Sequence, residues 1–581
     1  MPHLHLDLRQ ATSHLVQARL DLHPQGRTLR FSLPAWTPGS YLIRDYARQL
    51  EGLVVLQGGS ALQPSRTGVA SWLLELPDLE PVSIHYRLLA TELTVRTCHL
   101  NDQHGFLVLA AMALEVEGER WSSHQLSLAL PDGWSAAVPL PASGPHQWRA
   151  ASFDQLVDSP VEAGPHRVHS FTVAGVPHRW VTWGSSLQGL DPVEEDPGWL
   201  GAVEQICLAC CRAMGMERPP CAADGPAEGY LFVLHLTEQG YGGLEHDHSC
   251  VLQFGRRSLA RPEGRRKLLQ LVAHEYLHQW NVRRLRPAEL TPYCYGEPVV
   301  VPSLWFAEGI TSYLDQLLPH AAGLTTEAEV IADLGRDLSR YLLTPGRFVQ
   351  ALRESSQEAW VKLYKADAYA PDSQISYYLK GAVVALVLDL QLRQQGASLL
   401  TVMRELWLEF GARGRGYQQR DLIEAFARHH AELAKFLPAW LDARQDPPLE
   451  DSLGSVGLKL TSQPAPQLWC GWEFEPGGGD LRLRRVHRDS PAQQAGLMIG
   501  DELVAVEGFR VRRPEDLEPH LAIDPAPRAL QLLSCRDGVL QQRQLLPQAP
   551  RPASWVLEID PAADASAALR RAAWLQLQAA P

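Results

Sequence analysis

The sequence predicts a multidomain α+β protein, because its apolar pattern changes twice along the chain. A chain of 581 residues has roughly three or four domains by length alone. Residues 1 to about 170 alternate polar and apolar side chains over short runs. From about 195 the apolar residues recur at helical spacing, and short strand patterns return beyond Pro448.

The first domain, residues 1–170, is expected to be an antiparallel β domain. In runs such as Thr28–Leu33 and His124–Leu128 every second residue is apolar, and turn residues separate the runs. This alternation is typical of strands with one buried and one solvated face.

The second domain, residues 171–448, is expected to be mostly helical, with one strand at 230–236 near its start. Apolar residues at helical spacing predict the following helices: 196–214, 263–281, 304–318, 326–343, 376–395, 398–410 and 419–444. A third domain of short strands is expected at 449–548, followed by an Ala-rich C-terminal tail at 549–581 with room for a short helix.

Charge and composition exclude some classes of protein. The net charge of -13 argues against a nucleic-acid binder, which would carry basic surface for phosphates. We find neither a signal-peptide pattern at the N-terminus nor an apolar run long enough to cross a membrane. One apolar helix contains three cysteines, Cys207, Cys210 and Cys211, but the sequence lacks the second cysteine pair that a zinc knuckle needs. We therefore expect these thiols to be buried and reduced, and the protein to be cytoplasmic.

The strongest chemical signal is the pair His274 and His278 with Glu275 between them, in a segment without Gly or Pro. Residues four apart share one face of a helix, so both imidazoles can bind one zinc ion, while Glu275 can serve as the catalytic base. The third ligand is expected to be Glu308, the one charged residue in the apolar stretch 299–314.

Two other acids, Glu289 and Glu297, compete for the role of third ligand. Both lie in loop sequence that contains Pro, between the His pair and Glu308. The expected cofactor is one Zn²⁺ per chain, bound by His274, His278 and Glu308, with these two acids as alternatives for the third ligand.

Three segments together resemble the gluzincin metallopeptidases, and within them the glycyl aminopeptidase family that carries a C-terminal PDZ domain. They are His274–Asn281, Trp305–Gly309 and the N-terminal segment Pro34–Tyr46. The resemblance implies a thermolysin-like catalytic domain at 171–448, with a zinc helix at 263–281 and a third-ligand helix at 304–318. The loop 283–302 is longer than in aminopeptidase N relatives and is expected to line the cleft.

The resemblance also implies roles for substrate-binding residues. Gly242, Gly243 and Glu245 are similar to the exopeptidase motif, in which the carboxylate binds the free α-ammonium and the adjacent backbone pairs with the peptide. Tyr378, with Tyr377 as the alternative, is similar to the tyrosine that stabilises the oxyanion. His246 and His248 are expected to shape the pocket wall rather than to bind metal.

The segments Ser490–Leu497 and Gly500–Leu503 resemble a PDZ domain of the bacterial protease type. Its first strand is expected at Val456–Leu460, and its groove helix near Pro514. Such grooves capture C-terminal peptides, although the domain could instead brace the catalytic unit.

Together these expectations predict a zinc-dependent aminopeptidase that acts on peptides with a free N-terminus. The resemblance implies that the residue removed is Gly or Ala. We expect neither nucleic-acid nor membrane partners. Two alternatives stay open: a PDZ-assisted zinc endopeptidase, and a non-enzymatic PDZ scaffold.

Overall fold

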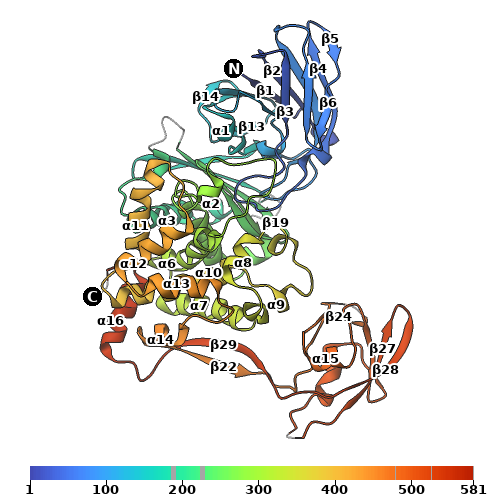
Figure 1. Cartoon of the computed structure of the whole chain (residues 1–581), viewed down its shortest axis with the longest axis vertical. Coiled ribbons are helices and arrows are strands. Elements are labelled where there is room, and N and C mark those ends of the chain that lie inside the picture. Colours follow the sequence, from blue (N-terminus) through green and yellow to red (C-terminus); the bar gives the residue numbers. More distant parts are fainter. Residues whose placement is uncertain (185–190, 223–228, 478, 525, 580–581) are drawn as a thin grey trace. The chain divides into compact units, whose positions relative to one another are not determined.

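The structure, a computed structural model (Figure 1), describes residues 1–184, 191–222, 229–477, 479–524 and 526–579. These residues form two compact units, each built from segments that are not contiguous in the sequence. The first unit contains 1–301, 314–325 and 400–425, and the second contains 302–313, 326–399 and 426–581.

The first unit begins with a β domain built on an eight-stranded sheet of order β14-β15-β12-β1-β2-β8-β4-β5. Alternate residues of its strands are buried, as the sequence predicts. The pair β1 and β12 runs parallel, a departure from the predicted antiparallel arrangement that alternation alone cannot show. The strands are β1 (His3–Asp7), β2 (Leu15–Leu22), β4 (Leu50–Gln57), β5 (Ser60–Leu62), β8 (Val82–Leu89), β12 (His124–Ala129), β14 (Ala142–Gly144) and β15 (Gln147–Ala150).

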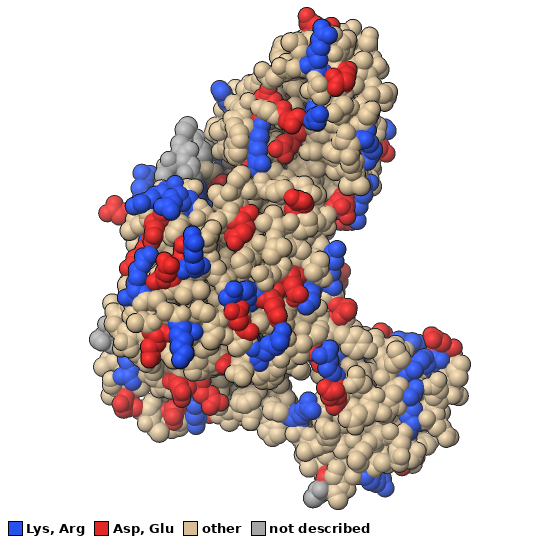
Figure 2. Space-filling view, viewed as in Figure 1, with Lys and Arg blue, Asp and Glu red and all other residues tan. Residues whose placement is uncertain are grey.

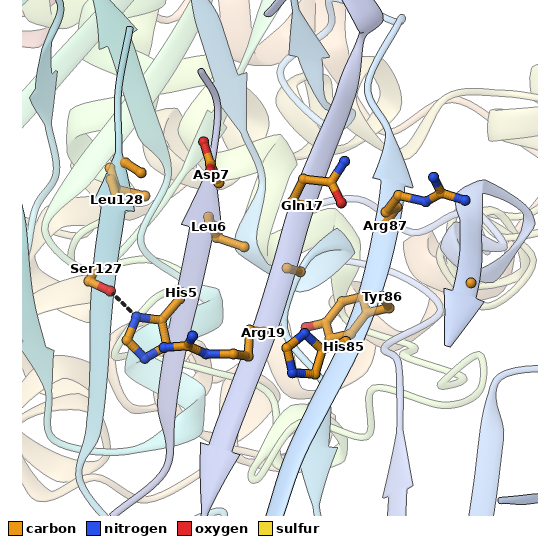
Figure 3. A pocket seen from close by; sticks show the side chains of 13 residues that line it. His5, Leu6, Asp7, Gln17, Arg19, His85, Tyr86, Arg87, Ser127 and Leu128 are labelled. Atoms are coloured by element: carbon orange, nitrogen blue, oxygen red, sulfur yellow. Dashed lines mark hydrogen bonds between the residues drawn. The ribbon is translucent and has the colours of Figure 1, made fainter. Parts of the chain in front are cut away.

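One face of this sheet carries polar side chains. Figure 3 shows a shallow pocket there, in which His5 is hydrogen-bonded to Ser127 beside Arg19. Two four-stranded sheets and a short helix complete the β domain. They contain β3 (Thr28–Ser32), β6 (Ser65–Gly68), β7 (Ser71–Glu75), β9 (His99–Leu100), β10 (Gly105–Leu107), β11 (Glu115–Val116), β13 (Ser135–Ala137), β16 (Val161–Gly164) and α1 (Phe153–Val157).

A five-stranded mixed sheet of order β17-β18-β19-β21-β20 follows in the same unit. The predicted strand at 230–236 is its centre, β19 (Tyr230–Thr237), which is buried on both faces. Strands β18, β19 and β21 run parallel, whereas β20 is an antiparallel edge strand. The other strands are β17 (Val168–Val173), β18 (Val176–Trp183), β20 (Tyr241–Glu245) and β21 (Ser249–Gly255).

The predicted helices are present, with 419–444 divided into α12 and α13 around residues 430–432. Side-chain N-caps explain where two of these helices begin. Thr326 forms a capping box with Glu329 at the start of α7, and Ser376 caps the start of α10. The helices are α2 (Pro192–Glu195), α3 (Trp199–Ala213), α4 (Arg256–Leu259), α5 (Gly264–Leu277), α6 (Ile310–Ala321), α7 (Glu327–Leu342), α8 (Leu352–Gln357), α9 (Ala370–Ser373), α10 (Tyr377–Gln394), α11 (Leu399–Glu409), α12 (Gln419–His429), α13 (Leu433–Asp442) and α14 (Leu449–Gly454).

The second unit also contains a six-stranded sheet with its own apolar core. The expected groove helix is a 3₁₀ segment, Pro514–His520. The sheet contains β23 (Trp472–Phe474), β24 (Leu481–Val486), β25 (Glu502–Val506), β26 (Phe509–Arg510), β27 (Leu530–Arg536) and β28 (Val539–Leu545), with α15 (Pro491–Gln494) beside them.

The prediction that Val456–Leu460 forms the first strand of this sheet is wrong. Strand β22 (Leu458–Pro464) instead pairs with β29 (Pro552–Ile559) in a separate two-stranded sheet. The stretch 549–581, expected as a tail, contains this β29 and α16 (Ala565–Leu575). Within the second unit the buried Trp574 side chain donates a hydrogen bond from Nε1 to the Tyr313 hydroxyl, at 2.6 Å. The polar N–H group of this buried indole therefore has a partner.

The charged surface and the burial of the cysteines are as the sequence predicts. On the face shown in Figure 2, acidic and basic side chains are interspersed. No helix among the described residues is long and apolar enough to cross a membrane. Cys207, Cys210 and Cys211 are buried free thiols, and burial raises the pKa of each.

Candidate active site

The two histidines of the sequence motif lie at the end of α5, in the first unit. His274 belongs to the last turn of the helix, and His278 is the residue that follows its end. The centroids of their rings are 4.7 Å apart, with the ring planes nearly perpendicular. The helix therefore presents both imidazoles on one face, as the spacing predicts.

Hydrogen bonds at Nδ1 fix the orientation and protonation of both rings. His274 Nδ1 lies 2.8 Å from Asp315 Oδ2, and His278 Nδ1 lies 2.5 Å from the Asn281 carbonyl oxygen. A carboxylate and a carbonyl only accept, so each Nδ1 carries a hydrogen, and in the neutral ring each Nε2 then presents its lone pair. Metal-binding histidines show this arrangement, in which an oxygen behind the ring directs the other nitrogen to the ion.

Glu275 lies where strand β20 meets α5. Its side chain is buried, and a Cβ atom at Gly243 would lie 2.2 Å from Glu275 Oε1. Only glycine allows the strand backbone to approach the carboxylate this closely. Ligand atoms of Glu275, Glu245 and His278 lie within 4.8 Å of one another, so the exopeptidase motif and the His motif adjoin in this unit.

Strand β20 presents backbone groups along an outer edge. His246 N donates to Ser249 O, so the antiparallel register with β21 turns the backbone N–H and C=O groups of Gly243 and Glu245 away from β21. Arg96, from the β domain, donates to the Gly243 carbonyl at 3.2 Å. An edge strand of this kind can accept an extended peptide as an added strand.

The Glu245 carboxylate is 4% exposed, and its Oε1 has no hydrogen-bond partner among the described residues. A loop of the β domain packs against it. Gly39 has a φ of +84°, and a Cβ atom there would lie within 2.8 Å of both carboxylate oxygens. A buried carboxylate with an unsatisfied oxygen is costly unless a cation binds it.

A buried ionic network supports the turn that follows Glu245. Asp158 accepts hydrogen bonds from Arg283 Nη2 at 2.7 Å and from His246 Nδ1 at 3.0 Å, and it also accepts one from the backbone of Asp247. Burial would raise the pKa of the Asp247 carboxyl, but Arg283 and two neighbouring arginines outweigh it and hold that pKa well below its usual range. This network thus holds the His246 ring in place beside Glu245.

The loop 283–302 contacts the β domain. Trp36 Nε1 donates to the Cys294 carbonyl at 2.7 Å, and Ala35 N donates to the Tyr295 carbonyl at 2.8 Å. The N-terminal segment Pro34–Tyr46 therefore binds this loop directly.

In the second unit, Glu308 is buried in a π-helical segment, Trp305–Gly309, that leads directly into α6. Such π-helical turns are rare and occur frequently at functional sites. Tyr377 is fully buried, whereas Tyr378 is half-buried, and both hydroxyls lie near that of Tyr364. Burial, the charge of Glu308 and the neighbouring tyrosines raise the pKa of Tyr378 well above its usual range. Tyr378 is therefore protonated and able to donate.

The two alternative candidates for the third metal ligand are more exposed than Glu308. Glu297 is exposed and Glu289 is half-buried in a short 3₁₀ turn. Among the described residues, neither these acids nor His246 and His248 belong to a group that could hold a metal ion.

Sequence reasoning missed several supporting residues. Asp315, Asp158 and Arg283 are distant in sequence from the groups they contact, and no local spacing relates them. One signal was available: Asp315 is the next acid after Glu308, in the same predicted helix.

Comparisons with known proteins agree with this arrangement. Residues 3–165 match the Peptidase M61 N-terminal domain, and residues 267–384 match M61 glycyl aminopeptidase. No curated protein sequence matches the chain.

Two solved structures are similar. An aminopeptidase N family protein from Idiomarina loihiensis is 27% identical, with a TM-score of 0.88 over 96% of this chain and 98% of that one. An M1 zinc metallopeptidase from Deinococcus radiodurans is 14% identical, with a TM-score of 0.48 over 77% of this chain and 94% of that one. The chain thus contains two regions that match M61 peptidase domains, and it is a peptidase.

Proposed function

We propose that this peptidase is a zinc-dependent aminopeptidase that removes an N-terminal Gly or Ala from peptides. The observation that carries the proposal is the buried Glu245 carboxylate, with one unsatisfied oxygen, at the end of an edge strand beside Glu275 and His278. A free α-ammonium group supplies the cation that this oxygen lacks. The preference for Gly is supported by the description of the family matched at 267–384, and Ala is included as the next smallest residue.

We assign the zinc ion to His274, His278 and Glu308. The Nδ1 hydrogen bonds support the two imidazoles, because they direct Nε2 as the ligand atom. Glu308 precedes Asp315 by about two turns of one continuous helical segment, so both carboxylates share a face of that segment. Since Asp315 binds His274, this face supports Glu308 as the third ligand.

A bound zinc ion lowers the pKa of water and polarises the scissile carbonyl group. Glu275 accepts the proton of the attacking water and passes it to the leaving amine. Tyr378 donates a hydrogen bond to the developing oxyanion, and Glu245 holds the substrate's ammonium group. The outward-facing backbone groups of Gly243 align the peptide along β20. The sequence assigns this role to Gly242 as well, but the backbone groups of Gly242 face β21 and are not available to a peptide.

The C-terminal sheet is proposed to be a PDZ domain that also braces the catalytic unit. Within the second unit, Arg485 of β24 binds buried Asp372 of α9 at 3.0 Å, and His487 lies 3.8 Å from the same carboxylate. These contacts favour bracing, while capture of a C-terminal peptide stays a prediction. Buried free thiols support the proposed cytoplasmic location.

Cleavage of blocked and unblocked substrates tests the proposal. The full chain should hydrolyse Gly- and Ala-anilides and leave their N-acetylated forms nearly intact, because acetylation removes the charge that Glu245 binds. Equal rates on both forms, or cleavage of internal bonds in acetylated peptides, would favour the endopeptidase alternative. No hydrolysis of any peptide would favour the scaffold.

A further inference from the structure

A second cluster of histidines surrounds a buried glutamate in the first unit, and it shares no residue with the proposed active site. Its members are Glu162 and His166 from β16 and the residues after it, His104 from the turn before β10, and His235 from β19. The side chains of Glu162, His104 and His235 are completely buried. The cluster thus joins the β domain to the central strand of the mixed sheet.

Distances within the cluster are those of groups that can share one ion. Glu162 Oε2 lies 2.9 Å from His235 Nε2, and Glu162 Oε1 lies 2.6 Å from His166 Nε2 and 4.0 Å from His104 Nε2. Ligand atoms of His104, Glu162 and His235 all lie within 4.8 Å of one another.

Several of these atoms lack hydrogen bonds. Both ring nitrogens of His104 have no hydrogen-bond partner among the described residues. Glu162 Oε1 and His166 Nε2 also lack one by geometry, although they form an ion pair with each other at 2.6 Å. A buried polar group without a partner is costly, and several around one carboxylate need a common explanation.

The surrounding residues hold the rings in place. The His104 ring stacks on Trp183, with centroids 4.0 Å apart. A Cβ atom at Gly164 would lie 2.4 Å from His166 Cε1, so only glycine leaves room for that ring.

We propose that Glu162, His104, His166 and His235 bind a second metal ion of the zinc class, which fastens the β domain to the mixed sheet. Three imidazoles and one carboxylate are the donors that such ions prefer, whereas Ca²⁺ and Mg²⁺ take oxygen ligands. The ion balances the buried negative charge of Glu162 and gives the His104 ring a partner. The chain then binds one ion more than the single zinc that its sequence predicts.

Zinc content of a chain without the catalytic histidines tests the proposal independently of any activity. The full chain carrying His274→Ala and His278→Ala is dialysed against Zn²⁺ and then against metal-free buffer, and its zinc is measured by mass spectrometry. It should retain about one zinc per chain. A zinc content near zero would overturn the proposal.

Further variants in the same background locate the ion. His235→Ala should lower the zinc content by about tenfold or more, because a structural site needs its full ligand set. His23→Ala, which removes an exposed histidine of the same β domain, should leave it unchanged. Zinc retained in full by His235→Ala would contradict the assignment.

Glu162→Gln preserves side-chain size in case His235→Ala does not fold. Zn²⁺ should raise the Tm of the chain that retains Glu162 and should not raise that of Glu162→Gln, because ligands stabilise only the state that binds them. An equal rise in both would refute the site.

Discussion

Replacement of Glu245 by alanine tests the amine-binding role most sharply. In the structure this carboxylate is buried and one of its oxygens lacks a partner, so a substrate ammonium group would form a desolvated charge pair with it. Removing one member of such a pair typically costs about 2–5 kcal/mol. The nearby Arg283 already supplies positive charge, which places the expected loss near the lower part of this range, at about 3 kcal/mol.

A loss of about 3 kcal/mol corresponds to a decrease of about a hundredfold in kcat/KM for peptides with a free N-terminus. The assay compares Gly-anilide with N-acetyl-Gly-anilide in the wild type and in Glu245→Ala. Acetylation should cost the wild type about a hundredfold and the variant little more, because the two changes remove the same contact.

A matched control comes from the connection between β19 and β20, which precedes the strand of Glu245. Glu238 is an exposed acid that pairs with Arg257, and Glu238→Ala should leave kcat/KM within about twofold. If acetylation and Glu245→Ala reduce kcat/KM additively, the carboxylate acts on something other than the substrate's amine, and the reasoning fails.

Three further predictions concern the metal and the oxyanion. Glu308→Ala should lose zinc from the catalytic site, measured by mass spectrometry, whereas Glu297→Ala should keep it; the reverse result would move the third ligand into the loop. Asp315→Asn should weaken zinc affinity by about 10- to 100-fold in a competition titration with a chelating dye, because the His274 ring loses its carboxylate; unchanged affinity would contradict the orienting role. Tyr378→Phe should lower kcat by about 100-fold while KM and zinc content stay unchanged, because its hydroxyl acts in the transition state. Steady-state kinetics of Tyr377→Phe provide the comparison, and a loss in that variant alone would shift the role by one residue.

Much of the fold follows from local patterns. Helical periodicity predicts α7 and α10 to within one residue at each end, because their apolar faces and caps are encoded in consecutive residues. Helix α5 begins within one residue of the predicted start but ends at Leu277, four residues before the predicted end. Strand partners are different, since pairing depends on residues far apart. Strand β22 therefore pairs with β29 rather than with the C-terminal sheet, although its own sequence resembles a first strand of that sheet.

The same distinction applies to the candidate site. The spacing of His274 and His278 predicts a shared helix face, which the structure has. The oxygens behind the rings, the loop around Gly39 and the cluster at Glu162 come from separate segments. No periodicity relates those segments, so only the folded chain reveals them.

Removal and restoration of the metal test the central claim most directly. The full chain is treated with a chelator, dialysed and supplied with two equivalents of Zn²⁺, enough for both proposed sites, while hydrolysis of Gly-anilide is followed beside a Glu275→Gln variant. We predict that hydrolysis stops without metal, returns with zinc, and stays at least about a hundredfold lower in Glu275→Gln even when that variant holds its full zinc content. Undiminished hydrolysis after complete metal removal, or near-normal turnover by zinc-loaded Glu275→Gln, would contradict a zinc aminopeptidase with Glu275 as its base.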